Sequence, residues 1–589
     1  MIASVRWNIA SVFASPAEAD AAIVAARERI AALTAFRGTL TAGATLAAFL
    51  AARDEAERLV GRIVNFATMW SSTDMEDDAA SGCWQKAMSL RSAFASAMSF
   101  AEPELDVRGE DELRGWVATT PALARRERWL ELHLRERPHR RSAEVEELLA
   151  DVAEPFAAPG LIAELLTESE LELGVPMAAV STLLSSVDPG ERQRAYVAAD
   201  GLHAVRNTLV AAYGASIRQS VVVARARRYP STLAAALEPD EVPVEIHAST
   251  LAAVTANTGS WHRHWRARRA RAGGTLHVAD LRAPLTGNPP AITYDEGCDL
   301  VIGGFDALGE EIADAVRRGL REDGWVDADP RPGKVGGGYS CGCQGIHPFI
   351  LLNWSDDTHG LGVLAHEVGH SLHSLLTFRA QPWHHADYSL FLAEVASNLG
   401  QILVREHVLR SDPSPDLELA ILDEAFTTLH RYLFTMPTLA RLEHELHSAV
   451  WSGGAVTADA VVDRCAALFA EGFGGEVAFE HDRVGMFWAS YTHLYADYYP
   501  FQYTTGIAAA YALAGPILAG DTDAVGRCVE LLSAGNSRPP LELLEAAGVD
   551  LRSPEPVNAA FRALDRITDR IAVTPLGPFA AGTRDRRGP

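Results

Sequence analysis

Val363-Leu-Ala-His-Glu-Val-Gly-His-Ser-Leu-His373 is the stretch of this chain that carries the most information. Leucine and valine recur at helical spacing through it, and histidines recur on another face, which predicts an amphipathic helix. Side chains at positions i and i+4 of a helix lie one above the other, with about 5–6 Å between their Cβ atoms. His366 and His370 can therefore reach one metal ion, while Glu367 holds a water molecule. This His-Glu-x-x-His pattern is typical of zinc hydrolases.

A third ligand is required, because catalytic zinc usually has three protein ligands and one open position. Glu394 is the best candidate, since it lies in the apolar stretch 389–400, which predicts a second helix. Residues 380–404 contain no lysine or arginine, and a carboxylate is costly to bury unless it is paired or bound to a metal. A solvent-facing glutamate is the alternative interpretation. His373 and His359 remain rivals for the third position.

These two segments resemble the oligoendopeptidase F branch of the thimet-type zinc oligopeptidases, peptidase family M3. The resemblance rests first on residues 366–401, which contain both predicted helices. Further segments resemble the family in the expected order, from about residue 200 to the end. They are Asp280–Leu285, Gly324–Ser340, Phe349–Trp354, Trp488–Gly506 and Ser533–Asp550. The chain departs from the family pattern at Val335, Pro500 and Phe501, which lie in segments expected to shape the substrate cleft.

The resemblance implies roles for particular residues. It implies one Zn²⁺ per chain, bound by His366, His370 and Glu394, with Glu367 as the catalytic base. It also implies that the oxyanion is stabilised by His493 and by one tyrosine of a group of four, Tyr495, Tyr498, Tyr499 and Tyr503, among which we favour Tyr503.

Substrate contacts are expected from three further segments. Tyr498 or Tyr499 is expected to contact the peptide backbone, although core packing is the alternative for either ring. A strand at 349–353, which includes Ile350 and Leu351, is expected to pair with an extended peptide beside the metal. The glycines at 336–338, among them Gly337 and Gly338, let a loop approach closely. Gly369 costs a helix about 1 kcal/mol relative to alanine, so its place between the histidines predicts close packing by a neighbouring element.

The rest of the chain predicts a mainly α protein. Helical periodicity appears at 16–35, 41–65, 86–100, 142–150, 159–167, 207–218 and 245–271, whereas strand signals appear only at 326–329, 349–353 and 275–278. The family resemblance implies a two-part, zincin-like helical fold, with a small sheet beside the zinc helix and a deep substrate channel. Asp188-Pro-Gly190 interrupts the helical pattern. We therefore expect a helical N-terminal domain at 1–188, a catalytic domain at 189–575 and a flexible tail at 576–589.

Composition excludes several other classes of protein. Hydrophobic residues make up 48% of the chain and charged residues 22%, which argues against disorder. The net charge of −25 repels phosphate backbones, so nucleic acid is not an expected partner. We find no secretory signal pattern and no apolar run of about 20 residues, which predicts a cytoplasmic protein that does not bind membranes. Its six scattered cysteines are expected to be free thiols, and Cys341-Gly-Cys343 is half of a metal motif at best.

The sequence favours one function and leaves two alternatives. We expect a zinc oligoendopeptidase that hydrolyses internal bonds of short, unfolded peptides, as a monomer or weak homo-oligomer. A metallo-carboxypeptidase or dipeptidyl peptidase would use the same chemistry, but it would need a group to hold the chain terminus, and the sequence does not place one. The other alternative is a catalytically inactive peptide-binding homologue. The intact Glu367 argues against it.

Overall fold

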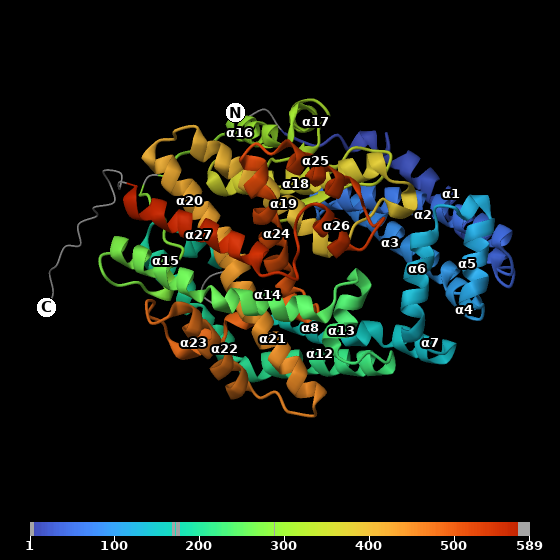
Figure 1. Ribbon diagram of the computed structural model, residues 1–589, viewed down its shortest axis with the longest axis horizontal. Helices are drawn as coiled ribbons and strands as arrows, with labels where there is room; N and C mark the ends of the chain where they lie inside the picture. The colour runs from blue at the N-terminus through green and yellow to red at the C-terminus, as the bar shows by residue number, and fades with distance from the viewer. Residues whose placement is uncertain (1–4, 168–170, 172–176, 288, 575–589) are drawn as a thin grey trace.

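The computed structural model describes residues 5–167, 171, 177–287 and 289–574 of the chain. The predicted tail, 576–589, lies outside these residues. Six helices, coloured blue, gather at one end of the molecule in Figure 1. They are α1 (Pro16–Leu33), α2 (Gly43–Thr73), α3 (Asp78–Met98), α4 (Ala101–Asp106), α5 (Glu110–Thr119) and α6 (Glu127–Glu136).

The remaining helices form the larger part of the molecule, and the mainly α fold is confirmed. They are α7 (Ala143–Asp151), α8 (Ala153–Leu165), α9 (Met177–Leu184), α10 (Pro189–Val197), α11 (Ala199–Ala204), α12 (Arg206–Ala226), α13 (Thr232–Leu237), α14 (Val244–Ala256), α15 (Thr258–Arg271), α16 (Tyr294–Phe305), α17 (Glu310–Arg321), α18 (Thr358–Ala380), α19 (Leu390–Arg410), α20 (Pro415–Leu429), α21 (Met436–Trp451), α22 (Ala458–Phe473), α23 (His481–Gly485), α24 (Pro500–Leu518), α25 (Thr522–Ser533), α26 (Pro540–Ala546) and α27 (Glu555–Val573).

One predicted helix is interrupted. The periodic segment 245–271 forms α14 and α15, which are separated at Asn257. The Asn257 side chain donates to the carbonyl of Ala253 at 2.9 Å. Such local side-chain bonds compete with the helical ladder, which accounts for the break.

The sheet has three short strands in the order β1-β3-β2. β1 (Val326–Asp327) runs parallel to β3 (Phe349–Leu351), and β2 (Tyr339–Cys341) runs antiparallel to it. β2 carries no strand signal in the sequence and was not predicted. The expected strand at 275–278 is wrong, since its only pairing is an isolated bridge between His277 and Ala478.

β3 is buried on both faces and joins two hydrophobic clusters. Phe349 and Leu351 pack with apolar side chains of α1, α2 and α3. Ile350 packs with the cluster that contains α18 and α19. The expected domain boundary near residue 188 remains a prediction.

The zinc-motif helix and its neighbour cross at very short range. α18 begins after Asp357, whose carboxylate accepts from the Gly360 N–H at 2.9 Å. A Cβ at Gly369 would lie 2.5 Å from the carbonyl oxygen of Ala396 on α19, which is closer than side-chain atoms approach. The close packing predicted from Gly369 is therefore confirmed, and only glycine permits this crossing.

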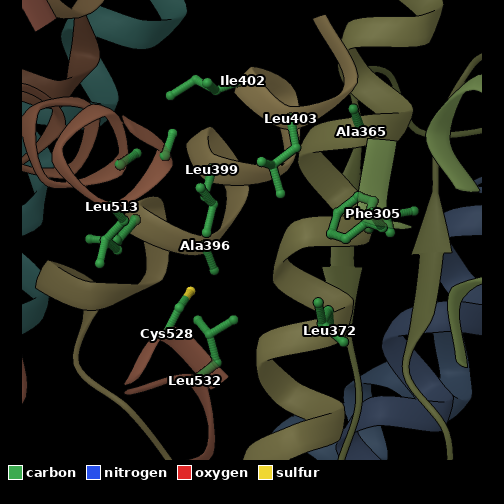
Figure 2. Packing of buried hydrophobic residues seen from close by; sticks show 14 of the residues in the cluster. Phe305, Ala365, Leu372, Ala396, Leu399, Ile402, Leu403, Leu513, Cys528 and Leu532 are labelled. Carbon is green, nitrogen blue, oxygen red and sulfur yellow. The ribbon is translucent and has the colours of Figure 1, made fainter. Parts of the chain in front are cut away.

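Apolar side chains pack behind the crossing. Figure 2 shows part of this cluster, contributed by α16, α18, α19, α24 and α25: Phe305, Ala365, Leu372, Ala396, Leu399, Leu403, Leu513, Cys528 and Leu532. The candidate site lies on the polar faces of α18 and α19, which do not take part in this cluster.

The segment Ile9–Phe36, which includes α1, passes a length-and-hydropathy test for a membrane span. One such helix is weak evidence, because a core helix and a signal sequence both pass the same test, and 28% of this window is buried. Ile23, Ala26 and Ile30 of α1 are buried against α2 and α3. The expected absence of a membrane span remains a prediction.

Candidate metal and catalytic site

Three side chains from α18 and α19 converge on one point. His366 Nε2 lies 3.2 Å from His370 Nε2 and 3.7 Å from Glu394 Oε2. Among the described residues, these three form the one group of His, Cys, Asp and Glu whose ligand atoms all lie within 4.8 Å of one another. Zinc bound tetrahedrally at its usual ligand distances would separate its ligand atoms by about 3.3–3.5 Å. The donor set and the spacing therefore fit a zinc ion.

Neighbouring groups orient these side chains. Ser397 Oγ donates to Glu394 Oε2 at 3.0 Å, and Asn398 Nδ2 donates to the Glu394 carbonyl at 2.6 Å. Gln401 Oε1 lies 3.3 Å from His366 Nδ1. With Nε2 turned toward the other ligands, the His366 ring donates to Gln401 from Nδ1, and such a bond fixes the tautomer of a metal ligand.

Gln401 is itself held by a buried ion pair. Its Nε2 lies 3.4 Å from Glu424 Oε1, and Glu424 binds the Arg405 guanidinium. A row of polar contacts thus runs from His366 through Gln401 and Glu424 to Arg405. Sequence reasoning did not identify Gln401 or Glu424. The signal for Gln401 was its position seven residues after Glu394, on the same face of α19.

The neighbouring carboxylate has the environment of a general base. Glu367 is 6% exposed, and its Oε2 has no hydrogen-bond partner among the described residues. Burial raises the pKa of Glu367 to about 7; His366 opposes the rise and Glu394 adds to it. A carboxylate with a pKa near neutrality is well suited to take a proton and return it.

The two rivals for the third ligand lie elsewhere. His373 is buried, and its ring stacks on Tyr388 with 3.6 Å between the ring centroids. Burial lowers the pKa of His373 to about 3. His359 is exposed in the first turn of α18. Neither belongs to the convergent group, and Glu394 does.

His493, Tyr499 and Tyr503 come together beside the ligand helices. The Tyr503 hydroxyl donates to the Tyr499 hydroxyl at 3.1 Å, and the His493 ring centroid lies 5.6 Å from that of Tyr503. A Cβ at Gly506 would lie 2.9 Å from the Glu394 Cβ, so α24 is pressed against the ligand-bearing turn of α19. Burial lowers the pKa of His493 to about 4, and the positive charge of Arg431 contributes. Neutral His493 and Tyr503 therefore provide hydrogen-bond donors in this region.

Tyr498 does not join this cluster. Its backbone adopts a left-handed conformation with φ of 57°, which directs it away from Tyr499. The Tyr498 hydroxyl lies 3.2 Å from Thr232 Oγ1, and its ring packs against His247 and His447. The expectation that Tyr498 contacts substrate is at odds with this burial, and core packing, the alternative, describes it better.

Ile350 and Leu351 are fully buried, and their strand is the central one of the sheet. The expected pairing of this strand with a peptide is therefore wrong, because β1 and β2 already occupy both of its edges. β2 is the edge strand on the side of α18. Its Ser340 Oγ lies 2.8 Å from Ser371 Oγ of α18.

The glycine-rich loop before β2 does approach the site. A Cβ at Gly338 would lie 3.4 Å from Glu367 Oε1, whereas Gly337 has a φ of 76° and open space around it. Asn353 Nδ2 donates to the carbonyls of Val335 and Gly337 at 2.9 and 3.3 Å, which holds the loop.

Lys334, at the start of this loop, also fixes the loop to the sheet. Its side chain is fully buried, and Nζ lies 2.7 Å from both Asp327 Oδ1 and the Leu352 carbonyl oxygen.

All six cysteines are free thiols. Burial raises the pKa of Cys341 to about 12 and that of Cys343 to about 11, so both are protonated at neutral pH.

Comparisons with known proteins show which proteins this chain is similar to. A model of peptidase family M3 matches residues 308–563, and a model named oligopeptidase F matches residues 108–172. Oligopeptidase PepF of Bacillus subtilis is 29% identical over 580 residues, covering 96% of this chain and 86% of that protein. Group B oligopeptidase PepB of Streptococcus agalactiae is 29% identical, covering 95% of each. The crystal structure of oligoendopeptidase-F from Enterococcus faecium shares the fold, with a TM-score of 0.71 and 24% identity over 94% of this chain and 98% of that one.

Proposed function

This chain belongs to the oligoendopeptidase F branch of peptidase family M3, a family of metallopeptidases, and we propose that it is a zinc-dependent enzyme that cuts internal bonds of short, unfolded peptides. The observation that carries the proposal is the convergence of His366, His370 and Glu394 beside the buried Glu367. A metal site next to an unpartnered buried carboxylate is the arrangement that hydrolysis by activated water requires.

The bound ion would supply Lewis-acid chemistry, by lowering the pKa of a water molecule to about 7 and polarising the scissile carbonyl. Glu367 accepts the proton of the attacking water and passes it to the leaving amine. Tyr503, whose hydroxyl proton turns from Tyr499 to the substrate, and neutral His493 donate hydrogen bonds to the oxyanion that forms on the substrate. Ser397 and Gln401 keep Glu394 and His366 in place while this happens.

The edge strand β2 is the proposed docking site for the peptide backbone. One edge of β2 pairs with β3, and the other pairs with no strand in the described part of the chain. Extended peptides add to such free edges through main-chain hydrogen bonds. Gly338, which precedes β2, lets this strand lie close to Glu367, because an added Cβ there would come within 3.4 Å of Glu367 Oε1.

The central test removes the base without removing the metal site. Glu367→Gln keeps the shape of the side chain and is expected to bind zinc as the wild type does, while kcat on a quenched peptide falls by about 10²–10⁴-fold. Glu245→Gln, the same change at an exposed residue of α14, is the matched control. Metal content should be measured on all three proteins.

Two outcomes would contradict the proposal: a Glu367→Gln protein as active as the wild type, or wild-type activity that survives complete metal removal. A peptide blocked at both ends separates endopeptidase from exopeptidase action. If the blocked peptide stays intact while the free one is trimmed, the carboxypeptidase or dipeptidyl peptidase alternative is correct. The expected monomer or weak homo-oligomer, the cytoplasmic location and the absence of nucleic-acid and membrane partners remain predictions.

A further inference from the structure

Arg431 lies in a π-helical turn, His430–Thr435, between α20 and α21. Such turns are rare and are often found at functional sites. The Tyr432 carbonyl, within this turn, accepts a hydrogen bond from Thr504 Oγ1 of α24 at 2.8 Å. The turn is therefore fixed to the helix that carries the catalytic tyrosine.

The turn places Arg431 at the margin of the tyrosine cluster. The Tyr432 ring stacks on Tyr503, with 5.0 Å between centroids and 7° between planes. The Arg431 Cζ lies 5.9 Å from the Tyr432 ring centroid. One aromatic ring thus separates the guanidinium from the hydroxyl proposed to bind the oxyanion.

Arg431 also differs in its environment from other arginines near the site. It is exposed, and it pairs with no carboxylate among the described residues. By contrast, Arg405 is buried against Glu424, and Arg268 is buried 3.1 Å from Asp423. In a chain with a net charge of −25, an arginine left without an acidic partner beside the active site is available for a ligand.

We propose that Arg431 binds a carboxylate group of the peptide substrate. The guanidinium presents parallel N–H donors that match a carboxylate, and charge-assisted bonds of this kind are about twice as strong as neutral ones. The carboxylate belongs either to an acidic side chain or to a free C-terminus. Arg431 acts within the proposed peptidase function, on which this assignment rests.

The test compares peptides that differ only in one carboxylate. One neutral peptide has an amidated C-terminus and no acidic residue. A second set replaces single glutamines of that peptide by glutamate, position by position, and a third peptide has a free C-terminus. We expect kcat/KM to be about 10–100-fold higher for at least one carboxylate peptide, as a hydrogen bond to a charged group predicts.

Variants of Arg431 then assign the preference. Arg431→Gln should reduce the ratio of kcat/KM between the favoured peptide and the neutral peptide to about one, and Arg431→Glu should reverse it in favour of a peptide with lysine at that position. Arg91→Gln, at an exposed residue of α3, is the matched control and should keep the wild-type ratio. A preference for one of the glutamate peptides would assign Arg431 to a side-chain carboxylate. A preference for the peptide with the free C-terminus would assign it to the C-terminal carboxylate.

The proposal is overturned if the wild type shows no preference, or if Arg431→Gln slows all peptides equally and keeps the ratio. Binding measured by calorimetry on the Glu367→Gln protein gives the same comparison without turnover. A carboxylate preference in binding that depends on Arg431 would support the assignment even if no peptide were cut. If the wild type bound these peptides but cut none of them, only the peptidase proposal would be contradicted.

Discussion

The two sides of the active site are built in different ways. On α18 and α19 the backbone is regular, and the ligands lie where helical spacing places them, with 3.2 Å between the nitrogen atoms of His366 and His370. Residues 491–499 instead pass through a short 3₁₀ turn and the left-handed Tyr498 before α24 begins at Pro500, and Tyr503 lies near the start of that helix. The comparison teaches that residue spacing predicts which side chains come together only where the backbone is regular, as in a helix.

The largest effect should come from comparing two tyrosines of the second side, Tyr503 within α24 and Tyr498 just before it. Tyr503→Phe removes a proposed oxyanion donor, so kcat should fall by about 10²–10³-fold. Tyr498→Phe removes only the hydrogen bond to Thr232, so kcat should stay near the wild-type value while stability falls by about 1 kcal/mol. Steady-state kinetics and urea unfolding on both variants make the comparison. If Tyr498→Phe were the slower enzyme, the roles given to the two rings would have to be exchanged.

A smaller effect is expected on the regular side, from the residue that holds a ligand. Gln401→Ala removes the acceptor for His366 Nδ1, and loss of such a partner typically weakens metal affinity by about 10–100-fold. Competition with a chromophoric chelator measures the change. Gln344→Ala, at a half-buried glutamine outside this network that bonds to the carbonyls of Phe378 and Gln381, is the control. Equal zinc affinity in wild type and Gln401→Ala would show that the network has no influence on the ligands.

The helix crossing itself is tested through the stability of the fold. Gly369→Ala places a methyl group against the carbonyl of Ala396, and overpacking of this kind typically costs about 1–3 kcal/mol. Gly259→Ala, in α15 with nothing within 4 Å of the added carbon, should instead be neutral or stabilising, because alanine favours the helix. Urea unfolding of both variants tests this. A Gly369→Ala protein as stable as the wild type would show that the two helices can separate freely.

The difference between the two sides also explains what the sequence could predict. The helices at 358–380 and 390–410, the convergence of Glu394 on the two histidines and the packing at Gly369 follow from periodicity and charge within single segments. β2 could not be predicted, because glycines at 336–338 weaken its strand signal and the strand is only three residues long. Because β2 was not predicted, β3 was not recognised as the central strand of the sheet. The expected pairing of β3 with a substrate peptide was wrong for that reason.

Residues outside regular elements were harder still. The sequence offers four tyrosines between 495 and 503, and it does not reveal the positive φ of Tyr498, whose side chain packs apart from Tyr499 and Tyr503. Arg431 gave no signal, because its position depends on a π-helical turn that interrupts the 3.6-residue period. Gln401 was within reach, since it shares a helix face with Glu394.

The crossing of α18 and α19 has one more consequence. Because two ligands come from one helix and the third from the other, an ion held there is a cross-link between segments that are separated along the chain. If the proposed site holds zinc in the folded protein and the unfolded chain does not, mass action predicts that thermal stability rises with the concentration of free zinc. The melting temperature would then report how much of the protein is loaded with metal.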